Sequence, residues 1–290
     1  MSHFVVLVIG GDVEGQLAPF DENLRVEEYE NYLTDEDVTR MKEYYEKQGE
    51  DVSTTEKLLK FMPEWNGGEG GVSEDGRLFY LSTYNPNSKW DWYQIGGRWS
   101  GYFRLKDGAA GILGEESAIA TLDPDHVSPD GEKFADIVLK RDIDFESERT
   151  AARVRAEKLF DEWEKITNGV TVPTWASIRD KHPDNIDAAR DEYHSIPVIK
   201  ELMKNRLVGF FEDPAEVFGV GREAYIQSEV DSIYVPYSIL KDGKWYAKGE
   251  MGWWGMSTDD MTQAEWNANV RKMFDELPDD TVITVVDCHI

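Results

Sequence analysis

The residue types best suited to chemistry stand together at the end of the chain, where Asp287, Cys288 and His289 are consecutive. A cysteine nucleophile needs a base oriented toward it through space, whereas neighbours on a strand point to opposite faces. Cys288 and His289 are therefore poorly placed to act on each other. Asp287 and His289 would share a face and could ligate a metal or share a proton. No third ligand matches them in the sequence, so we favour a hydrogen-bonded strand end.

Other motifs for chemistry are weak. The run from Asp123 to His126 contains two acids and one histidine on a proline-broken loop, which is more typical of a surface turn than of a metal site. The chain has five histidines and no Cys-x-x-Cys pair, which argues against a zinc site. The loop at Gly10 and Gly11 lacks the P-loop lysine and an evident helix after it. We expect no metal and no cofactor, and the sequence favours a protein that is not an enzyme without deciding the question.

Two tryptophan-rich segments, 89–103 and 244–256, contain six of the ten tryptophans. Large aromatic side chains are mostly buried, so a core role is the favoured interpretation. The alternative is a rigid contact surface or a ligand site. The candidate partner-binding or ligand-binding residues are Trp90, Trp92, Tyr93, Arg98, Trp99, Trp253 and Trp254.

Arg98 stands between a glycine and a tryptophan. A guanidinium stacks on rings and forks onto oxyanions, so Arg98 could clamp an anion. A structural ion pair or cation–π contact is the favoured alternative.

Hydrophobic patterns predict strands in several places. They lie at Phe4–Ile9, Leu78–Thr83, Ser232–Leu240 and Thr281–Val286. Residues 90–103 suggest paired strands in a hairpin around Gly96 and Gly97. Asp242-Gly243 accepts the positive φ angles of a type I′ turn and is the clearest hairpin signal.

Short motifs also indicate where helices begin. Thr34 with Asp37, and Thr262 with Glu265, each predict a helix N-terminus. The pattern from 145 to 166 is helical, and a second helix is expected after Pro183 with Asp184 as its cap.

These elements predict an α+β fold, with a mainly antiparallel sheet, flanking helices and an inserted helical module. We assign residues 1–144 and 207–290 to the two parts of the core and 145–206 to the helical insertion. The arrangement requires both ends of the chain to meet in one core, covered by the helix that ends near Leu277.

The composition is strongly acidic, with 58 Asp and Glu against 31 Lys and Arg in 290 residues, a formal charge of −27. Such a charge repels a nucleic-acid backbone, so direct nucleic-acid binding is disfavoured. Residues 21–51 alone contain twelve acidic and four basic side chains. A solvated acidic surface is the simplest interpretation, and a basic protein partner or imitation of nucleic-acid charge are alternatives.

A single cysteine fits a reducing compartment, and the N-terminal apolar run is too short for a signal peptide or a membrane span. We therefore expect a cytoplasmic protein with no membrane association.

Four blocks of the sequence resemble a family of hypothetical proteins carried by bacteriophages and prophages. They are the N-terminal Phe4–Gly10 run with Gln16–Asn23, Lys89–Trp99, Gly249–Gly255 and the ending from Leu277 to His289. The resemblance implies a phage origin. It suggests an anti-defence protein similar to the Gabija anti-defence inhibitors, which enclose a host nuclease complex. No motif matches a known inhibitory contact, so no functional residue is transferred.

The sequence leaves two functions open. The first is an oligomeric protein that binds a bacterial defence nuclease complex in the host cytoplasm and inhibits it. The second is a site between the two tryptophan-rich segments that sequesters or hydrolyses a signalling nucleotide, with Arg98 on its anionic group. A virion or scaffold role has little support, because the chain lacks repeats and low-complexity tails.

Overall fold

A computed structural model describes residues 3–116, 134–209, 212–251 and 257–290 and confirms the α+β class. The chain divides into two compact units. One comprises residues 1–13 and 93–288, and the other comprises 14–92 with 289–290. Each unit contains a hydrophobic core of its own.

The larger unit is built on a sheet with the strand order β12-β11-β1-β15-β10-β7; in addition, β5 pairs with β15, and β8 pairs with β5. The sheet is mixed, because β1 runs parallel to β11 while β10 and β12 pair antiparallel with their neighbours. Its strands are β1 (His3–Ile9), β5 (Trp92–Gly97), β7 (Gly111–Ile112), β8 (Glu115–Glu116), β10 (Ile137–Leu139), β11 (Ser238–Lys241), β12 (Lys244–Ala247) and β15 (Val282–His289). Two small pairs accompany it, β6 (Phe103–Arg104) with β9 (Phe134–Ala135) and β13 (Gly249–Met251) with β14 (Ser257–Asp259).

Helix α11 (Gln263–Glu276) covers this sheet. Its capping box is formed by Thr262 and Glu265, as predicted. Trp266, Val270 and Phe274 are buried in one cluster with side chains from β1, β11 and β15. Strand β1 lies next to β15, so the expected meeting of the chain ends in one core is confirmed.

Two strand predictions were wrong. Strands β5 and β6 do not form a hairpin, because β5 pairs with β15 and β8 whereas β6 pairs with β9. The strand expected from Ser232 begins only at Ser238, since Tyr234 has a left-handed backbone with φ of 54°. The turn at Asp242 and Gly243 is confirmed, with φ of 53° and 70° between paired strands.

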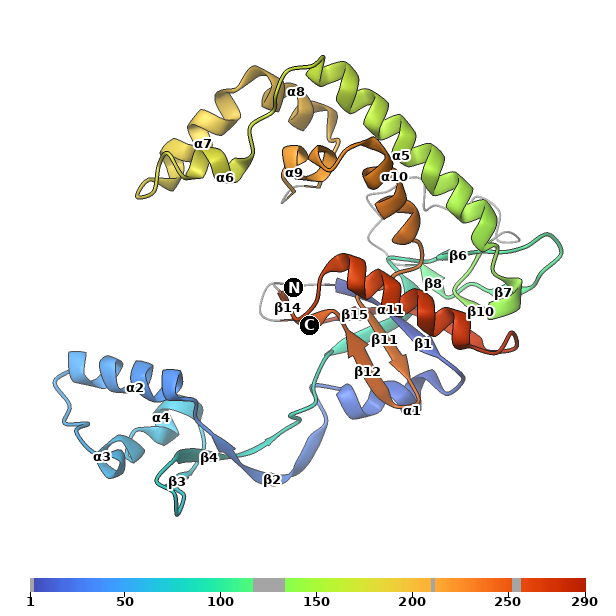
Figure 1. Ribbon diagram of the computed structural model, residues 1–290. Helices are drawn as coiled ribbons and strands as arrows, with labels where there is room; N and C mark the ends of the chain where they lie inside the picture. The colour runs from blue at the N-terminus through green and yellow to red at the C-terminus, as the bar shows by residue number, and fades with distance from the viewer. Residues whose placement is uncertain (1–2, 117–133, 210–211, 252–256) are drawn as a thin grey trace. The chain divides into compact units, whose positions relative to one another are not determined.

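The helical segment of the larger unit runs on past residue 206. It comprises α5 (Phe145–Thr167), α6 (Trp175–Arg179), α7 (Ile186–Ser195), α8 (Pro197–Asn205), α9 (Pro214–Gly219) and α10 (Arg222–Asp231), after the short η3 (Lys140–Asp142) (Figure 1). Phe160, Phe218 and Tyr225 belong to its own buried cluster. The cap of α7 is Asn185 and not Asp184, because the Asn185 side chain accepts the Ala188 N–H at 3.0 Å.

The smaller unit contains a three-stranded antiparallel sheet with the order β2-β4-β3. Its elements are α1 (Val13–Leu17), η1 (Ala18–Phe20), β2 (Arg25–Tyr32), α2 (Asp35–Lys47), α3 (Thr55–Leu59), α4 (Met62–Asn66), β3 (Gly70–Val72) and β4 (Leu78–Tyr84). Thr34 and Asp37 form the predicted capping box of α2, which buries Met41 and Tyr45. The five-residue α1 follows the Gly10–Gly11 loop, where no helix was expected.

Within the described ranges, no helix has the length and apolar character needed to cross a membrane.

Candidate functional site

The first tryptophan-rich segment turns at Gly96 beside a buried carboxylate, that of Asp136. This carboxylate accepts four hydrogen bonds, from the backbone N–H groups of Gly101 (2.6 Å), Gly114 (2.7 Å) and Tyr102 (3.2 Å) and from the Ser100 hydroxyl (3.0 Å). Burial raises the pKa of Asp136, and the four hydrogen bonds offset part of that shift. The carboxylate thus supplies acceptors for turn N–H groups that would otherwise be unpaired.

A second buried carboxylate, that of Asp287, fixes the next residues. Its Oδ2 accepts the Arg98 backbone N–H at 3.0 Å, and its Oδ1 lies 2.7 Å from His3 Nδ1. A Cβ atom built on Gly97 would stand 2.5 Å from the Asp287 Cβ, so the turn has room only for glycine there. Asp287 therefore has a structural role.

The other C-terminal residues with reactive side chains have separate surroundings. His289 Nδ1 lies 2.6 Å from Asp91 Oδ1, so His289 does not share the partner of Asp287. Cys288 is buried, and burial raises the pKa of its thiol. A thiol that stays protonated is a poor nucleophile.

The candidate aromatic residues have different environments. Trp90 is buried, and its Nε1 donates to the Leu17 carbonyl at 3.1 Å. Trp92 is 45% exposed, while Tyr93 and Trp99 are half-buried, Trp99 against the core of the larger unit. Trp253 and Trp254 lie outside the described residues, as does the Asp123–His126 run.

The Arg98 side chain is half-buried, and its Nε is buried without a hydrogen-bond partner among the described residues. Neither the structural ion pair nor the cation–π contact favoured from the sequence is found for it there.

A cavity of about 490 Å³, which the sequence did not indicate, lies in the larger unit between α5, α10 and the β6 region. Its polar wall contains Tyr102, Arg104, Glu148, Arg155 and Glu229. Its apolar wall contains Phe134, Ala152, Ala156, Leu159, Ile233 and the ring of Tyr234. The volume is within the range of small-molecule sites.

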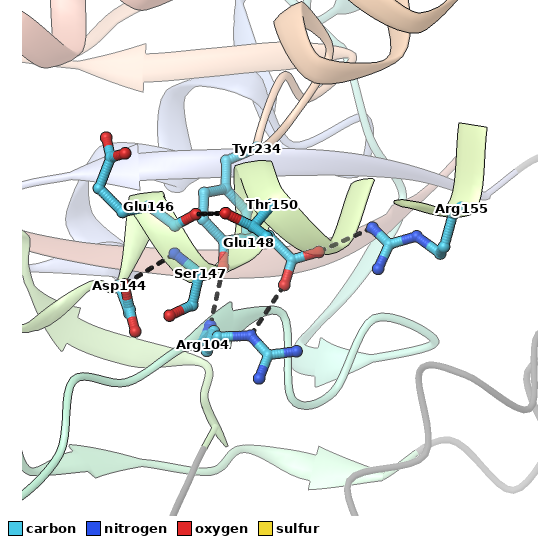
Figure 2. Close-up of polar contacts among 8 residues, drawn as sticks. All are labelled: Arg104, Asp144, Glu146, Ser147, Glu148, Thr150, Arg155 and Tyr234. Carbon is cyan, nitrogen blue, oxygen red and sulfur yellow. Dashed lines mark hydrogen bonds and ion pairs between the residues drawn. The ribbon is translucent and has the colours of Figure 1, made fainter. Parts of the chain in front are cut away.

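Glu148 joins the two arginines of this cavity, as Figure 2 shows. Arg104 Nε lies 3.0 Å from one Glu148 oxygen and Arg155 Nη2 lies 2.8 Å from the other. The Glu148 side chain is only 14% exposed. The Arg104 backbone N–H donates to the Tyr234 hydroxyl at 2.9 Å, and its guanidinium lies over the Phe134 ring at 5.1 Å. Each guanidinium is thereby held by one oxygen of the Glu148 carboxylate.

The two carboxyl groups of the cavity have pKa shifts of opposite direction. Burial acts to raise the pKa of Glu148, but hydrogen bonds and charges from Arg155 and Arg104 outweigh it and leave the pKa below its usual value. Glu229 is an exposed residue overall, yet burial around its carboxyl and the charge of Glu212 raise its pKa. The cavity thus contains a firmly ionised carboxylate and one that takes up a proton more readily.

The arginines give this cavity the means to bind an anion. Guanidinium N–H groups and the Tyr102 hydroxyl supply donors, and none of the described residues that line the cavity is a cysteine or a histidine. Among the residues that the structure describes, no three His, Cys, Asp or Glu side chains gather as a metal site would require.

Comparison of the chain with protein-family models, with curated proteins and with solved structures finds no match.

Proposed function

We propose that this is a phage-encoded anti-defence protein, which binds a bacterial defence nuclease complex and inhibits it through an acidic surface. The observation behind the proposal is the concentration of exposed acidic side chains on β2 and α2 of the smaller unit, which together are termed its acidic face. Its exposed acidic side chains are Glu27, Glu28, Glu30, Asp35, Glu36, Glu43 and Glu46.

Little basic charge offsets this acidic face. Residues 14–92 contain 19 acidic and 8 basic side chains. On α2 the described ion pair is that of Asp37 with Arg40, while Glu36, Glu43 and Glu46 have no ion-pair partner among the described residues. A solvated carboxylate array attracts a basic surface and suppresses association with nucleic acid.

Helix α2 also carries an exposed aromatic side chain that could anchor a partner. Tyr44 on α2 is 49% exposed, and its ring lies 5.8 Å from the Trp65 ring. Tyrosine and tryptophan are enriched among residues that dominate binding energy, and charged residues at the rim mainly set orientation and association rate. A basic protein groove that normally accepts DNA is the partner that fits this combination.

The experiment is a DNA-cleavage assay with purified defence nuclease complexes, in low salt and with the protein in molar excess. We expect one complex to be inhibited, and the inhibition to weaken as salt is raised. Full cleavage by every complex tested, with no co-purifying partner, would contradict the proposal.

A matched pair of variants tests the surface. The triple substitution Glu36→Gln, Glu43→Gln and Glu46→Gln should reduce inhibition at least tenfold. The control, Asp184→Asn, Asp191→Asn and Glu223→Gln, removes the same charge from exposed positions of the helical segment and should leave inhibition unchanged. Equal loss in both variants would mean that only total charge matters.

A second function, nucleotide binding by the tryptophan-rich segments, is favoured by one observation: the buried Nε of Arg98 has no hydrogen-bond partner within the described part of the chain. A buried donor without a partner costs free energy that an anionic ligand would recover. Tryptophan fluorescence should then respond to a nucleotide, and Arg98→Ala should abolish the response.

A further inference from the structure

The cavity between α5, α10 and β6 has donor groups that its own ion pairs leave unused. Each guanidinium has five N–H donors, and Arg104 and Arg155 each give only one side-chain bond to Glu148. The Arg155 side chain is 50% exposed and that of Arg104 is 32% exposed, so the remaining N–H groups are accessible.

Two arginines and two carboxyl groups line the cavity, and burial raises the pKa of one of these carboxyls, that of Glu229. Glu148 lies between the two guanidiniums and accepts one N–H from each, so the other N–H groups of both arginines remain available to a ligand (Figure 2). An oxyanion bound there would add a second negative group beside the two arginines, as Glu148 is the first. A planar guanidinium can donate two parallel N–H bonds, and this geometry matches two oxygens of a phosphate.

The rest of the wall suits a planar, partly polar body. The rings of Tyr102 and Tyr234 lie 5.5 Å apart and are tilted by 49°, and Phe134 and Leu159 add apolar surface. The Tyr102 hydroxyl makes no hydrogen bond with the described protein, and the Glu229 carboxyl can accept from ring N–H groups.

A larger cavity of about 740 Å³, bordered by α5, α10 and α11, lacks this arrangement. Four of its five cations have partners among the described residues, and Arg153 has none there. Arg149 pairs with Glu146, Arg271 pairs with Asp231, and Lys140 donates to the Leu277 carbonyl at 2.6 Å. The smaller cavity differs in that two arginines share one carboxylate, that of Glu148, and three aromatic side chains line it.

We propose that the cavity lined by Arg104, Arg155, Tyr102 and Glu229 binds a nucleoside phosphate, with the phosphate on the two arginines and the base between the aromatic side chains and Glu229. This site is distinct from the acidic face of the smaller unit and does not depend on the function proposed for that face.

The test is isothermal titration calorimetry of the full chain with the nucleoside 5′-monophosphates of adenine, guanine, cytosine and uracil, together with the free nucleosides and inorganic phosphate. At least one monophosphate should bind, and should do so at least tenfold more tightly than its nucleoside, since charge-assisted hydrogen bonds to the phosphate are lost without it. Absence of binding by every monophosphate at millimolar concentration would overturn the proposal.

Variants locate the site. Arg155→Gln should weaken binding at least tenfold, and Tyr102→Phe, which removes only a hydroxyl, should weaken it severalfold. Arg190→Gln removes an arginine that pairs with Asp187 on α7 and should bind as the parent does. Arg98→Ala should also leave binding intact, which separates this cavity from the tryptophan-rich segments.

Two outcomes would count against the cavity. Unchanged affinity in both Arg155→Gln and Tyr102→Phe would place the ligand elsewhere. Equal weakening by Arg190→Gln and Arg155→Gln would show that only general charge attracts the nucleotide. Circular dichroism of each variant confirms that the fold is intact before binding is interpreted.

Discussion

At the scale of single residues, the glycine pair of the first tryptophan-rich segment is explained by two distant carboxylates. Gly96 and Gly97 were predicted to break the strand, and both have positive φ. Their hydrogen-bonding surroundings were not predictable, because Asp136 and Asp287 lie far away in sequence and nothing local pairs them with this turn. The predicted hairpin was wrong for the same reason.

We expect Gly97→Ala to destabilise the larger unit by about 2–4 kcal/mol. The added Cβ would lie 2.5 Å from Asp287, and φ is +56°, so overpacking and backbone strain both contribute. Gly108→Ala is the control, because its φ is +75° but nothing lies within 4 Å of the added Cβ. Urea unfolding of the two variants compares them directly, and equal losses would show that the close approach to Asp287 is unimportant.

At the scale of elements, structure set by neighbouring residues was predictable and structure set by distant contacts was not. The capping boxes of α2 and α11 and the β11–β12 turn each depend on a few consecutive residues, and all three are confirmed. The cavity at α5 depends on Arg104 meeting Glu148 across 44 residues, and no periodic pattern indicates such a pair. Helix α10, with a weakly amphipathic sequence, was also missed.

The attachment of α5 to β6 through Glu148 should be pH-dependent. The pKa of Glu148 is lower in the folded chain than its ordinary value of 4.5, because Arg155 and Arg104 outweigh the effect of burial. The carboxylate therefore stabilises the fold at neutral pH, and this contribution is lost as pH falls below 4.5 through the folded pKa.

We accordingly expect Glu148→Gln to lower the free energy of unfolding by about 1–2 kcal/mol at pH 7 and by less at pH 3. The expected loss is small because both arginines are partly exposed to solvent. Thermal unfolding at both pH values measures the difference from the parent chain. Glu146→Gln, at a side chain that is 86% exposed, should have little effect at either pH. A cost for Glu148→Gln that is the same at pH 3 and pH 7 would contradict the role given to its charge.

At the scale of the whole molecule, the chain leaves the larger unit after residue 13 and returns to it at residue 93. The sequence indicated one core formed by both chain ends, and that core is present. It did not indicate that residues 14–92 enclose a second core, with Met41, Leu58 and Met62 fully buried. The acidic stretch 21–51 contains the edge strand β2 as well as the helix predicted from Thr34 and Asp37.

Because each unit has its own core, we expect local destabilisation to remain within one unit. Thr34→Ala removes the cap of α2 in the smaller unit, and Thr262→Ala removes the cap of α11 in the larger unit. Each change should lower the free energy of unfolding by about 1 kcal/mol. In hydrogen exchange followed by mass spectrometry, Thr34→Ala should lower amide protection only within residues 14–92. Thr262→Ala should lower it only in the larger unit. The reason is that separate cores open as separate cooperative units. A loss of protection that spreads through both units in either variant would show instead that the two cores unfold as one.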